Sequence, residues 1–217
     1  MSNPPKFTLS DKIYVQLRQD IIKQIIPCGQ KLTLQALKDR FNVSHTPIRQ
    51  ALTRLNEEGL VTYYSNCGVT VVTFTAEDIK ELFQFASELD ALSVKLCQYG
   101  YSSMPLLFEF EKLEEKSTEA LKHNDINTWQ GLSEDFHLLF YKYAKNNYLT
   151  SASKKLQSKI ALISNMYQTE ENISKINSDH QEIIQAIREN DYEKASLLMR
   201  QHSQNDVIFA LKAFNML

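Results

Sequence analysis

The chain has 217 residues, of which 43% are apolar and 23% are charged, as in a globular protein of one large or two small domains. No apolar run approaches the roughly 18 residues of a membrane span, and the first residues lack the apolar core of a signal peptide. We therefore expect a cytoplasmic protein with no membrane partner. The net charge of −2 is unevenly spread, because residues 1–74 carry nine Lys and Arg against five Asp and Glu, and the remainder fifteen against twenty-one. A basic first part on an acidic body favours contact of the first part with a polyanion.

The cysteines argue against two classes of protein. Cys28, Cys67 and Cys97 are odd in number, widely spaced and without a CxxC pair. A disulfide framework and a cysteine zinc site are therefore not expected.

Three helices are expected within the first 60 residues, after a loose polar arm. Ser10 is the expected N-cap of the first helix, which Pro27–Gly29 ends. Thr33 can cap a short second helix. The third helix begins near Thr46-Pro47, because proline is tolerated in a first helical turn.

Hydrophobic period two then replaces the helical period. Residues 60–64 are expected to form a strand, residues 65–68 a turn, and residues 69–72 the return strand. Three helices followed by a hairpin are the layout of a winged helix-turn-helix.

Helical periodicity continues from Thr75 onward, and Thr75 with Asp78 resembles a capping box. The expected helices cover residues 76–98, 105–122, 126–146, 149–168, 173–188 and 191–213. We therefore predict a mostly α protein with two domains. Residues 1–74 form a winged helix-turn-helix DNA-binding domain, and residues 75–217 form an all-α bundle of six to seven helices.

Residues 43–52, Val-Ser-His-Thr-Pro-Ile-Arg-Gln-Ala-Leu, carry the most informative motif. In a helix-turn-helix, the first residues of the recognition helix reach base edges in the major groove. Ser44 and Thr46 can donate to phosphates at the helix N-terminus, and Arg49 can pair with guanine or hold a phosphate. The same residues have simpler explanations, since the hydroxyls could be helix caps, and His45 and Arg49 could be solvated side chains.

With this motif the chain resembles the GntR family of bacterial transcriptional regulators, in the FadR subfamily with a C-terminal ligand-binding and dimerisation domain of the FCD type. The resemblance spans nearly the whole chain. It is carried by residues 31–37, 43–52 and 55–61, and by the wing up to Gly68. It implies a regulator that binds double-stranded operator DNA as a homodimer and responds to a small-molecule effector held in the helical domain.

The resemblance also assigns DNA contacts residue by residue. Arg49 matches the family's second recognition arginine, Thr46 matches a phosphate- or base-contacting threonine, and Gly68 matches the glycine that lets the wing enter the minor groove. His45 stands where the family usually has an arginine. This change predicts an operator core different from the usual one, because histidine is largely neutral at pH 7.

Two further positions belong to the DNA-binding assignment. Gln35 stands where an arginine or glutamate is common. Asn66 lies in the wing turn, where a turn role competes with a DNA contact.

Three of the five histidines, His137, His180 and His202, fall within three different expected helices. On inward faces of a bundle they could converge on one cation, and imidazole suits zinc, nickel, iron or copper. A lone histidine in a helix is more often simply packed. The resemblance adds that many FCD-type domains bind a divalent metal with one Asp and three His, and these three positions match its histidines.

The remaining ligand positions depart from the family pattern. Its aspartate, one turn before the first histidine, is Ser133 here, and Glu134 could substitute. Loss of the carboxylate predicts weaker binding and a preference for nitrogen-preferring ions such as zinc or nickel. In the effector pocket, the family's arginine and glutamate on the first bundle helix are Ala86 and Asp90, which argues against a simple organic-acid effector.

Three functions remain open from the sequence. The leading one is an effector-controlled regulator, in which a divalent metal assists ligand binding. A degenerate regulator would bind DNA without effector control. A metal-dependent hydrolase would use the histidine site, but Glu134 is the only evident general base.

Overall fold

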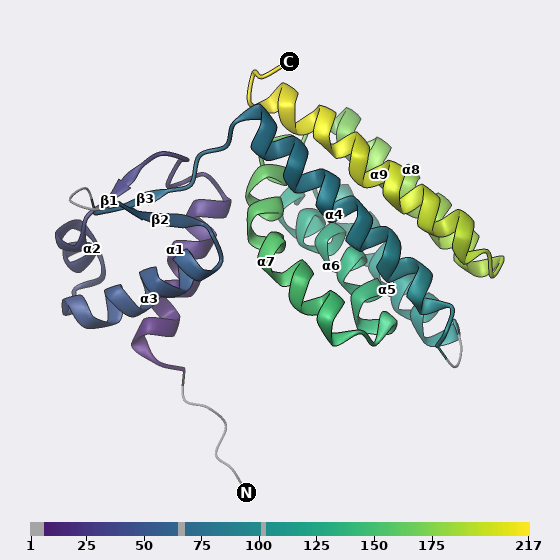
Figure 1. Ribbon diagram of the computed structural model, residues 1–217, viewed down its shortest axis with the longest axis horizontal. Coiled ribbons are helices and arrows are strands. Elements are labelled where there is room, and N and C mark those ends of the chain that lie inside the picture. Colours follow the sequence, from purple (N-terminus) through teal and green to yellow (C-terminus); the bar gives the residue numbers. More distant parts are fainter. Residues whose placement is uncertain (1–6, 65–67, 101–102) are drawn as a thin grey trace, which may run out of the picture. The chain divides into compact units, whose positions relative to one another are not determined.

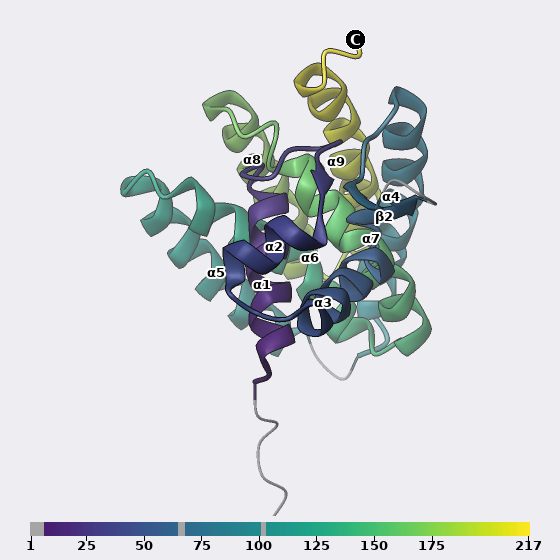
Figure 2. The ribbon, with the colours of Figure 1, turned by 90° about the vertical axis from the view of Figure 1, so that its left-hand side faces the viewer.

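The computed structural model describes residues 7–64, 68–100 and 103–217. The chain divides into two compact units. The first contains the residues up to Phe74 together with residues 157–163, and the second contains the other residues from Thr75 onward. Figure 1 shows the elements of both units, and Figure 2 gives a second view in which α1, α2 and α3 can be followed.

The first unit is a winged helix-turn-helix. Its sheet has the order β1-β3-β2, and both neighbouring pairs of strands are antiparallel. In the register, Leu32 lies opposite Val69, and Thr62 lies opposite Thr70. The elements are α1 (Leu9–Ile22), β1 (Lys31–Leu32), α2 (Leu34–Phe41), α3 (His45–Glu57), β2 (Val61–Tyr64) and β3 (Gly68–Val71).

Local capping sets where these helices begin. The N-cap of α1 is Thr8, which forms a capping box with Asp11, so the expected cap at Ser10 was wrong by two residues. A box satisfies two free N–H groups at once, which Ser10 alone would not do. Thr33 caps α2 as expected by accepting from the Ala36 N–H. Helices α1 and α3 pack together, and their contact is built on fully buried side chains such as Leu17, Ile21, Ile48, Leu52 and Leu55.

The second unit is all-helical within the described residues. The helices from Thr75 onward are α4 (Ala76–Cys97), α5 (Met104–Lys122), α6 (Ile126–Ala144), α7 (Asn147–Ser164), α8 (Glu170–Arg188) and α9 (Tyr192–Ala213). Residues 157–163 of α7 are counted in the first unit. Thr75 and Asp78 form the expected capping box of α4. Helix α4 lies beside α9 and also packs against α6 (Figure 1). Among the described residues, no helix has the length and apolarity needed to cross a membrane.

Aromatic side chains from two helices form the centre of this unit. The Phe110 ring of α5 lies 5.1 Å from the ring of Phe136 and 5.0 Å from that of Phe140, both on α6. Isoleucines of α8, including Ile183 and Ile184, belong to the same buried cluster. This core therefore ties α5, α6 and α8 together directly beside the positions of the histidines.

Candidate nucleic-acid interface and histidine site

The N-terminus of α3 is exposed and bears the side chains singled out from the sequence. Ser44 is the N-cap residue by backbone position, but its side chain makes no capping hydrogen bond. Ser44, His45, Thr46 and Arg49 are all exposed, whereas Ile48 between them is buried. The buried residue anchors the helix, and the exposed hydroxyls and cation remain available to a ligand. The cap explanation therefore does not account for the Ser44 hydroxyl.

Ion pairing in the first unit separates structural arginines from free ones. Three of its five acidic residues are engaged in ion pairs, Arg18–Glu58, Arg40–Asp20 and Arg54–Asp11. Within the described part of the chain, Arg49, Lys31 and Lys38 take part in no ion pair. The positive charge that is left over thus includes Arg49 at the start of α3.

After β2, the described part of the wing resumes at Gly68, whose φ is +86°. This left-handed conformation suits glycine, and a β-carbon there would meet nothing closer than 3.7 Å, so strain and not crowding requires the glycine. The same β-carbon would lie 3.8 Å from Cε of Lys31, which places a lysine beside the wing strand. Lys31 was not among the expected contacts, because the two-residue strand β1 carries no periodicity. Asn66 lies outside the described residues.

Gln35 is exposed on α2, where its Nε2 donates to Asp39 Oδ1 at 2.8 Å. This local hydrogen bond along the helix competes with any contact that Gln35 would make to DNA.

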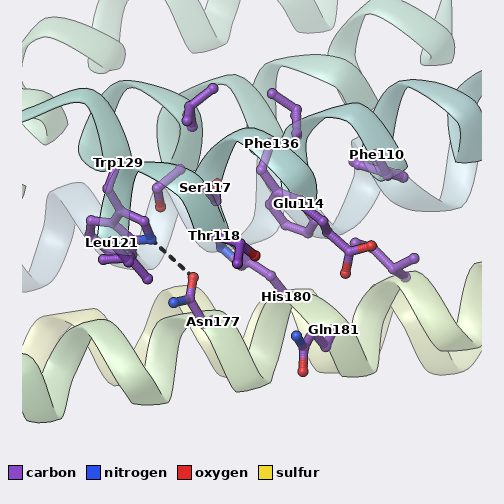
Figure 3. Close-up of a pocket in the computed structure, with 14 residues that line it drawn as sticks. Phe110, Glu114, Ser117, Thr118, Leu121, Trp129, Phe136, Asn177, His180 and Gln181 are labelled. Atoms are coloured by element: carbon purple, nitrogen blue, oxygen red, sulfur yellow. Dashed lines mark hydrogen bonds between the residues drawn. The ribbon is translucent and has the colours of Figure 1, made fainter. Parts of the chain in front are cut away.

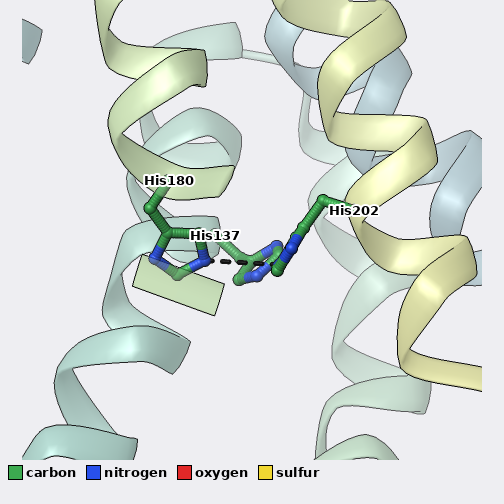
Figure 4. A group of neighbouring side chains, drawn as sticks. All are labelled: His137, His180 and His202. Carbon is green, nitrogen blue, oxygen red and sulfur yellow. Dashed lines mark hydrogen bonds between the residues drawn. The ribbon is translucent and has the colours of Figure 1, made fainter. Parts of the chain in front are cut away.

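The three histidines converge in the second unit (Figure 4). His137 comes from α6, His180 from α8 and His202 from α9. One candidate ligand atom from each lies within 4.8 Å of the other two. His180 and His202 are 8% and 2% exposed, so their imidazoles meet away from bulk water.

The geometry of this group fits a metal ion. His180 Nε2 and His202 Nε2 are 3.3 Å apart. Two nitrogens bound to zinc at about 2.0–2.1 Å with tetrahedral angles lie about 3.3–3.4 Å apart. The His137 ring would have to close toward this pair, since the group as a whole spans up to 4.8 Å.

Two of the imidazole rings have a carboxylate beside Nδ1, and this contact orients the ring. His202 Nδ1 lies 3.3 Å from Asp179 Oδ2, and His137 Nδ1 lies 3.2 Å from Asp90 Oδ2, although the His137 contact lacks hydrogen-bond alignment. Metal-ligating histidines commonly have such a partner on the second ring nitrogen. The first contact directs Nε2 of His202 at His180.

A lowered pKa keeps His180 neutral, so that a ring nitrogen has a lone pair available for a metal ion. Burial, and then the neighbouring His202 and His137, lower the pKa of His180 well below its usual value. A neutral imidazole is the form that binds metal. Burial is the largest influence on the pKa of His137 and lowers it, but the charge and close contact of Asp90, together with the charges of Asp206 and Glu134, outweigh burial and raise that pKa.

The position of the family aspartate faces a small cavity. Ser133 and His180 both line a cavity of about 90 Å³ between α5, α6 and α8 (Figure 3). On the same wall, Nε1 of the buried Trp129 donates to Asn177 Oδ1 at 3.0 Å. Ser133 therefore shares a cavity with a histidine, but brings a hydroxyl where the family has a carboxylate.

The two expected effector residues lie on α4, away from this cavity, whose lining comes from α5, α6 and α8. Ala86 is buried. Asp90 accepts from the hydroxyls of Tyr141 and Ser203 at 2.6 and 3.1 Å, and lies beside His137. Asp90 therefore supports the histidine site. Its role in an effector pocket stays a prediction.

One further acidic residue, which sequence reasoning missed, lies near the histidine site. Asp206 lies one turn after His202 on α9, and its Oδ1 is buried. The four-residue spacing from His202 was the available signal, because residues i and i+4 share a helix face.

A winged helix-turn-helix with a free basic recognition helix, joined to an all-helical unit, defines the class of DNA-binding transcriptional regulators. Residues 9–71 match the family of bacterial regulatory proteins called the gntR family, and residues 81–205 match the FCD domain. The chain therefore belongs to the GntR family of transcriptional regulators, in the group with an FCD domain.

Similar proteins span nearly the same length. The HTH-type transcriptional regulator YdhC of Bacillus subtilis is 24% identical over 198 residues, which are 90% of this chain and 88% of that protein. The HTH-type transcriptional repressor GlaR of Escherichia coli is 23% identical over 201 residues, 87% of this chain and 90% of that one. The solved structure of Escherichia coli McbR/YncC shares the fold, with a TM-score of 0.79 at 19% identity over 96% of this chain and 99% of that one. The family and these relatives point to regulators and not enzymes, so a metal-dependent hydrolase is not supported.

Proposed function

We propose that this protein binds operator DNA through the N-terminus of α3 and the wing, and that a small ligand in the helical unit controls this binding. The observation that carries the DNA-binding part is the exposed Ser44, His45, Thr46 and Arg49 group on a helix that the buried Ile48 anchors. Hydroxyls and a helix N-terminus suit phosphates, and Arg49 suits guanine. As a regulator of bacterial type, it would act in the cytoplasm.

A homodimer is supported by a second apolar face on α4. The inner face of α4 packs in the core, yet Phe85 and Leu92 are 53% and 43% exposed. Leu89 and Leu96 are partly buried on the same side, since all four follow the spacing of one helix face. An exposed apolar stripe of this kind favours a protein partner, and two-fold operators favour a second copy of the chain.

We propose that His137, His180 and His202 hold a divalent metal such as zinc or nickel. The 3.3 Å spacing of two Nε2 atoms and the neutral His180 support this assignment. The ion would supply a Lewis-acidic point that can bind a donor atom of an effector. The histidines themselves would link α6, α8 and α9.

The effector would enter the cavity between α5, α6 and α8, because this cavity reaches His180. Its volume of about 90 Å³ corresponds to about three water molecules, so the ligand must be small unless the cavity widens. Among the described residues that line this cavity, Glu114 is acidic and none is a lysine or arginine, so the cavity offers no cation to a carboxylate ligand. These features favour a neutral or cationic effector over an organic acid.

The test is DNA binding with and without metal. DNA duplexes would be selected from a random pool with the full-length protein, and affinity measured by fluorescence anisotropy at several salt concentrations. We expect affinity to fall steeply with salt, and zinc or nickel to change it in the wild type but not in His180→Ala. Absence of selected sequences would refute the DNA-binding proposal. Selected DNA with no response to metal or to a screen of small ligands would favour the degenerate regulator.

A further inference from the structure

The carboxylate of Asp206 lies in surroundings that call for a cation. Asp206 Oδ1 is a buried side-chain oxygen without a hydrogen-bond partner among the described residues. A buried polar atom left without a partner is costly, and a charged one more so. Something that the chain itself does not contribute would remove this cost.

The groups around Asp206 come from several helices. Burial raises the pKa of Asp206, while the nearby His202 and His137 and a hydrogen bond from the Tyr167 hydroxyl lower it, and the nearby Asp179 raises it. None of these groups is a lysine or arginine. Two of the three histidines therefore lie within electrostatic reach of Asp206.

Other acidic residues near the histidines are already engaged. The Asp90 carboxylate lies beside Nδ1 of His137 and accepts from two hydroxyls. The Asp179 carboxylate lies beside Nδ1 of His202 and pairs with Lys175. Each of these carboxylates contacts Nδ1 of its histidine, which faces away from Nε2. Neither is therefore placed to reach an ion between the three rings.

We propose that Asp206 is the carboxylate ligand of the metal site, in place of the carboxylate that Ser133 lacks. The proposal rests on the metal site of the proposed function. The site would then take a divalent cation with three imidazole nitrogens and one carboxylate oxygen, a donor set that suits zinc. The Asp206 oxygens do not belong to the 4.8 Å histidine group, so the carboxylate turns toward the ion by a change of side-chain rotamer when metal binds.

If Asp206 is the carboxylate ligand, the side of the metal site that faces the α5–α6–α8 cavity remains available to an effector. With Asp206 on α9 as ligand, position 133 on the side toward the α5–α6–α8 cavity brings a hydroxyl and no carboxylate ligand. An effector atom from that cavity would then meet the ion next to His180.

The experiment measures metal affinity of the full-length, metal-stripped protein. Zinc is titrated against a competing chelator, and cobalt is used as a probe because its visible absorption reports the ligand set. Asp206→Asn keeps the shape of the side chain and removes the charge, while Ser133→Ala and Glu134→Gln are matched controls. Helical circular dichroism in the presence of chelator checks that each variant folds.

We expect Asp206→Asn to lower zinc affinity by at least tenfold, since even partners behind the ligands are worth about 10- to 100-fold, and to change the cobalt spectrum. The controls should bind as the wild type does. Ser133→Asp combined with Asp206→Asn should recover affinity, because a carboxylate returns one turn before His137. If the wild type binds metal and Asp206→Asn binds it equally well, or if Glu134→Gln alone loses affinity, the proposal is overturned while the histidine site stands. A wild type that binds no metal overturns both.

Discussion

Two arginines on α3 are expected to respond to alanine substitution in opposite ways. Arg49 is exposed and has no ion pair within the described chain, whereas Arg54 is bound to Asp11 at 2.6 Å and lies 3.7 Å over the ring of Tyr14. Both are arginines on one helix, five residues apart. They therefore separate DNA contact from fold stability within a single element.

The magnitudes follow from these contacts. Arg49→Ala removes no ion pair and no side-chain hydrogen bond within the described residues, so the free energy of unfolding should change by no more than about 0.5 kcal/mol. On DNA it should cost about 1–3 kcal/mol for each half-site, or about 5- to 150-fold in affinity. Arg54→Ala loses the stacking on Tyr14, worth about 0.5–1 kcal/mol, and the ion pair, which salt screens because it is exposed.

The assay measures both quantities on the same proteins. Anisotropy with a selected operator gives affinity, and thermal unfolding followed by circular dichroism gives stability. We expect Arg49→Ala to bind the operator more weakly while its thermal unfolding midpoint stays unchanged. Arg54→Ala should unfold at a lower temperature but keep most of its operator affinity when affinity is measured well below that temperature. The reasoning is refuted if Arg49→Ala binds the operator as the wild type does, or if Arg54→Ala weakens DNA binding without any loss of stability.

Three further substitutions test separate parts of the molecule. His45→Arg should tighten binding to the operator core usual for the family, and unchanged affinity in a competition assay would mean that this position does not contact that core. Gly68→Ala should destabilise the fold by about 1–2 kcal/mol, because φ is +86° and an L-residue is strained there; an unaltered thermal midpoint would contradict this. Asn177→Leu leaves the N–H of Trp129 without its acceptor and should cost about 1–3 kcal/mol. Since the chain has one tryptophan, its fluorescence should shift as well, and an identical emission spectrum together with identical stability would contradict the reasoning.

The sequence alone determined the type of each major element. Hydrophobic periods of about 3.6 and 2 are local properties, so the helices of both units and the hairpin of the wing could be predicted before any tertiary contact was known. The overall fold, mostly α with a winged helix-turn-helix followed by a helical bundle, is confirmed. The motif of residues 43–52 also pointed to the regulator family that the comparisons show.

Features that depend on pairing between distant segments were not visible in the sequence. The strand β1 has two residues, too few for a period, and exists because Lys31 and Leu32 pair with β3. Lys31 therefore came to lie beside Gly68 without any local signal. The Thr8 cap was missed for a different reason, since Ser10 is an equally good cap residue and only the reciprocal contact with Asp11 selects Thr8.

The histidine site shows the same division. Helical faces allowed three histidines to converge, and their spacing matched the family pattern, but which acidic groups stand behind them depends on how four helices pack. Tertiary structure placed Asp90 beside Nδ1 of His137, Asp179 beside Nδ1 of His202, and the half-buried Asp206 near both histidines. The sequence determines the chemistry of each side chain, whereas helix packing decides which side chains lie close together. Distances between helices are set by the core and not by positions along the chain.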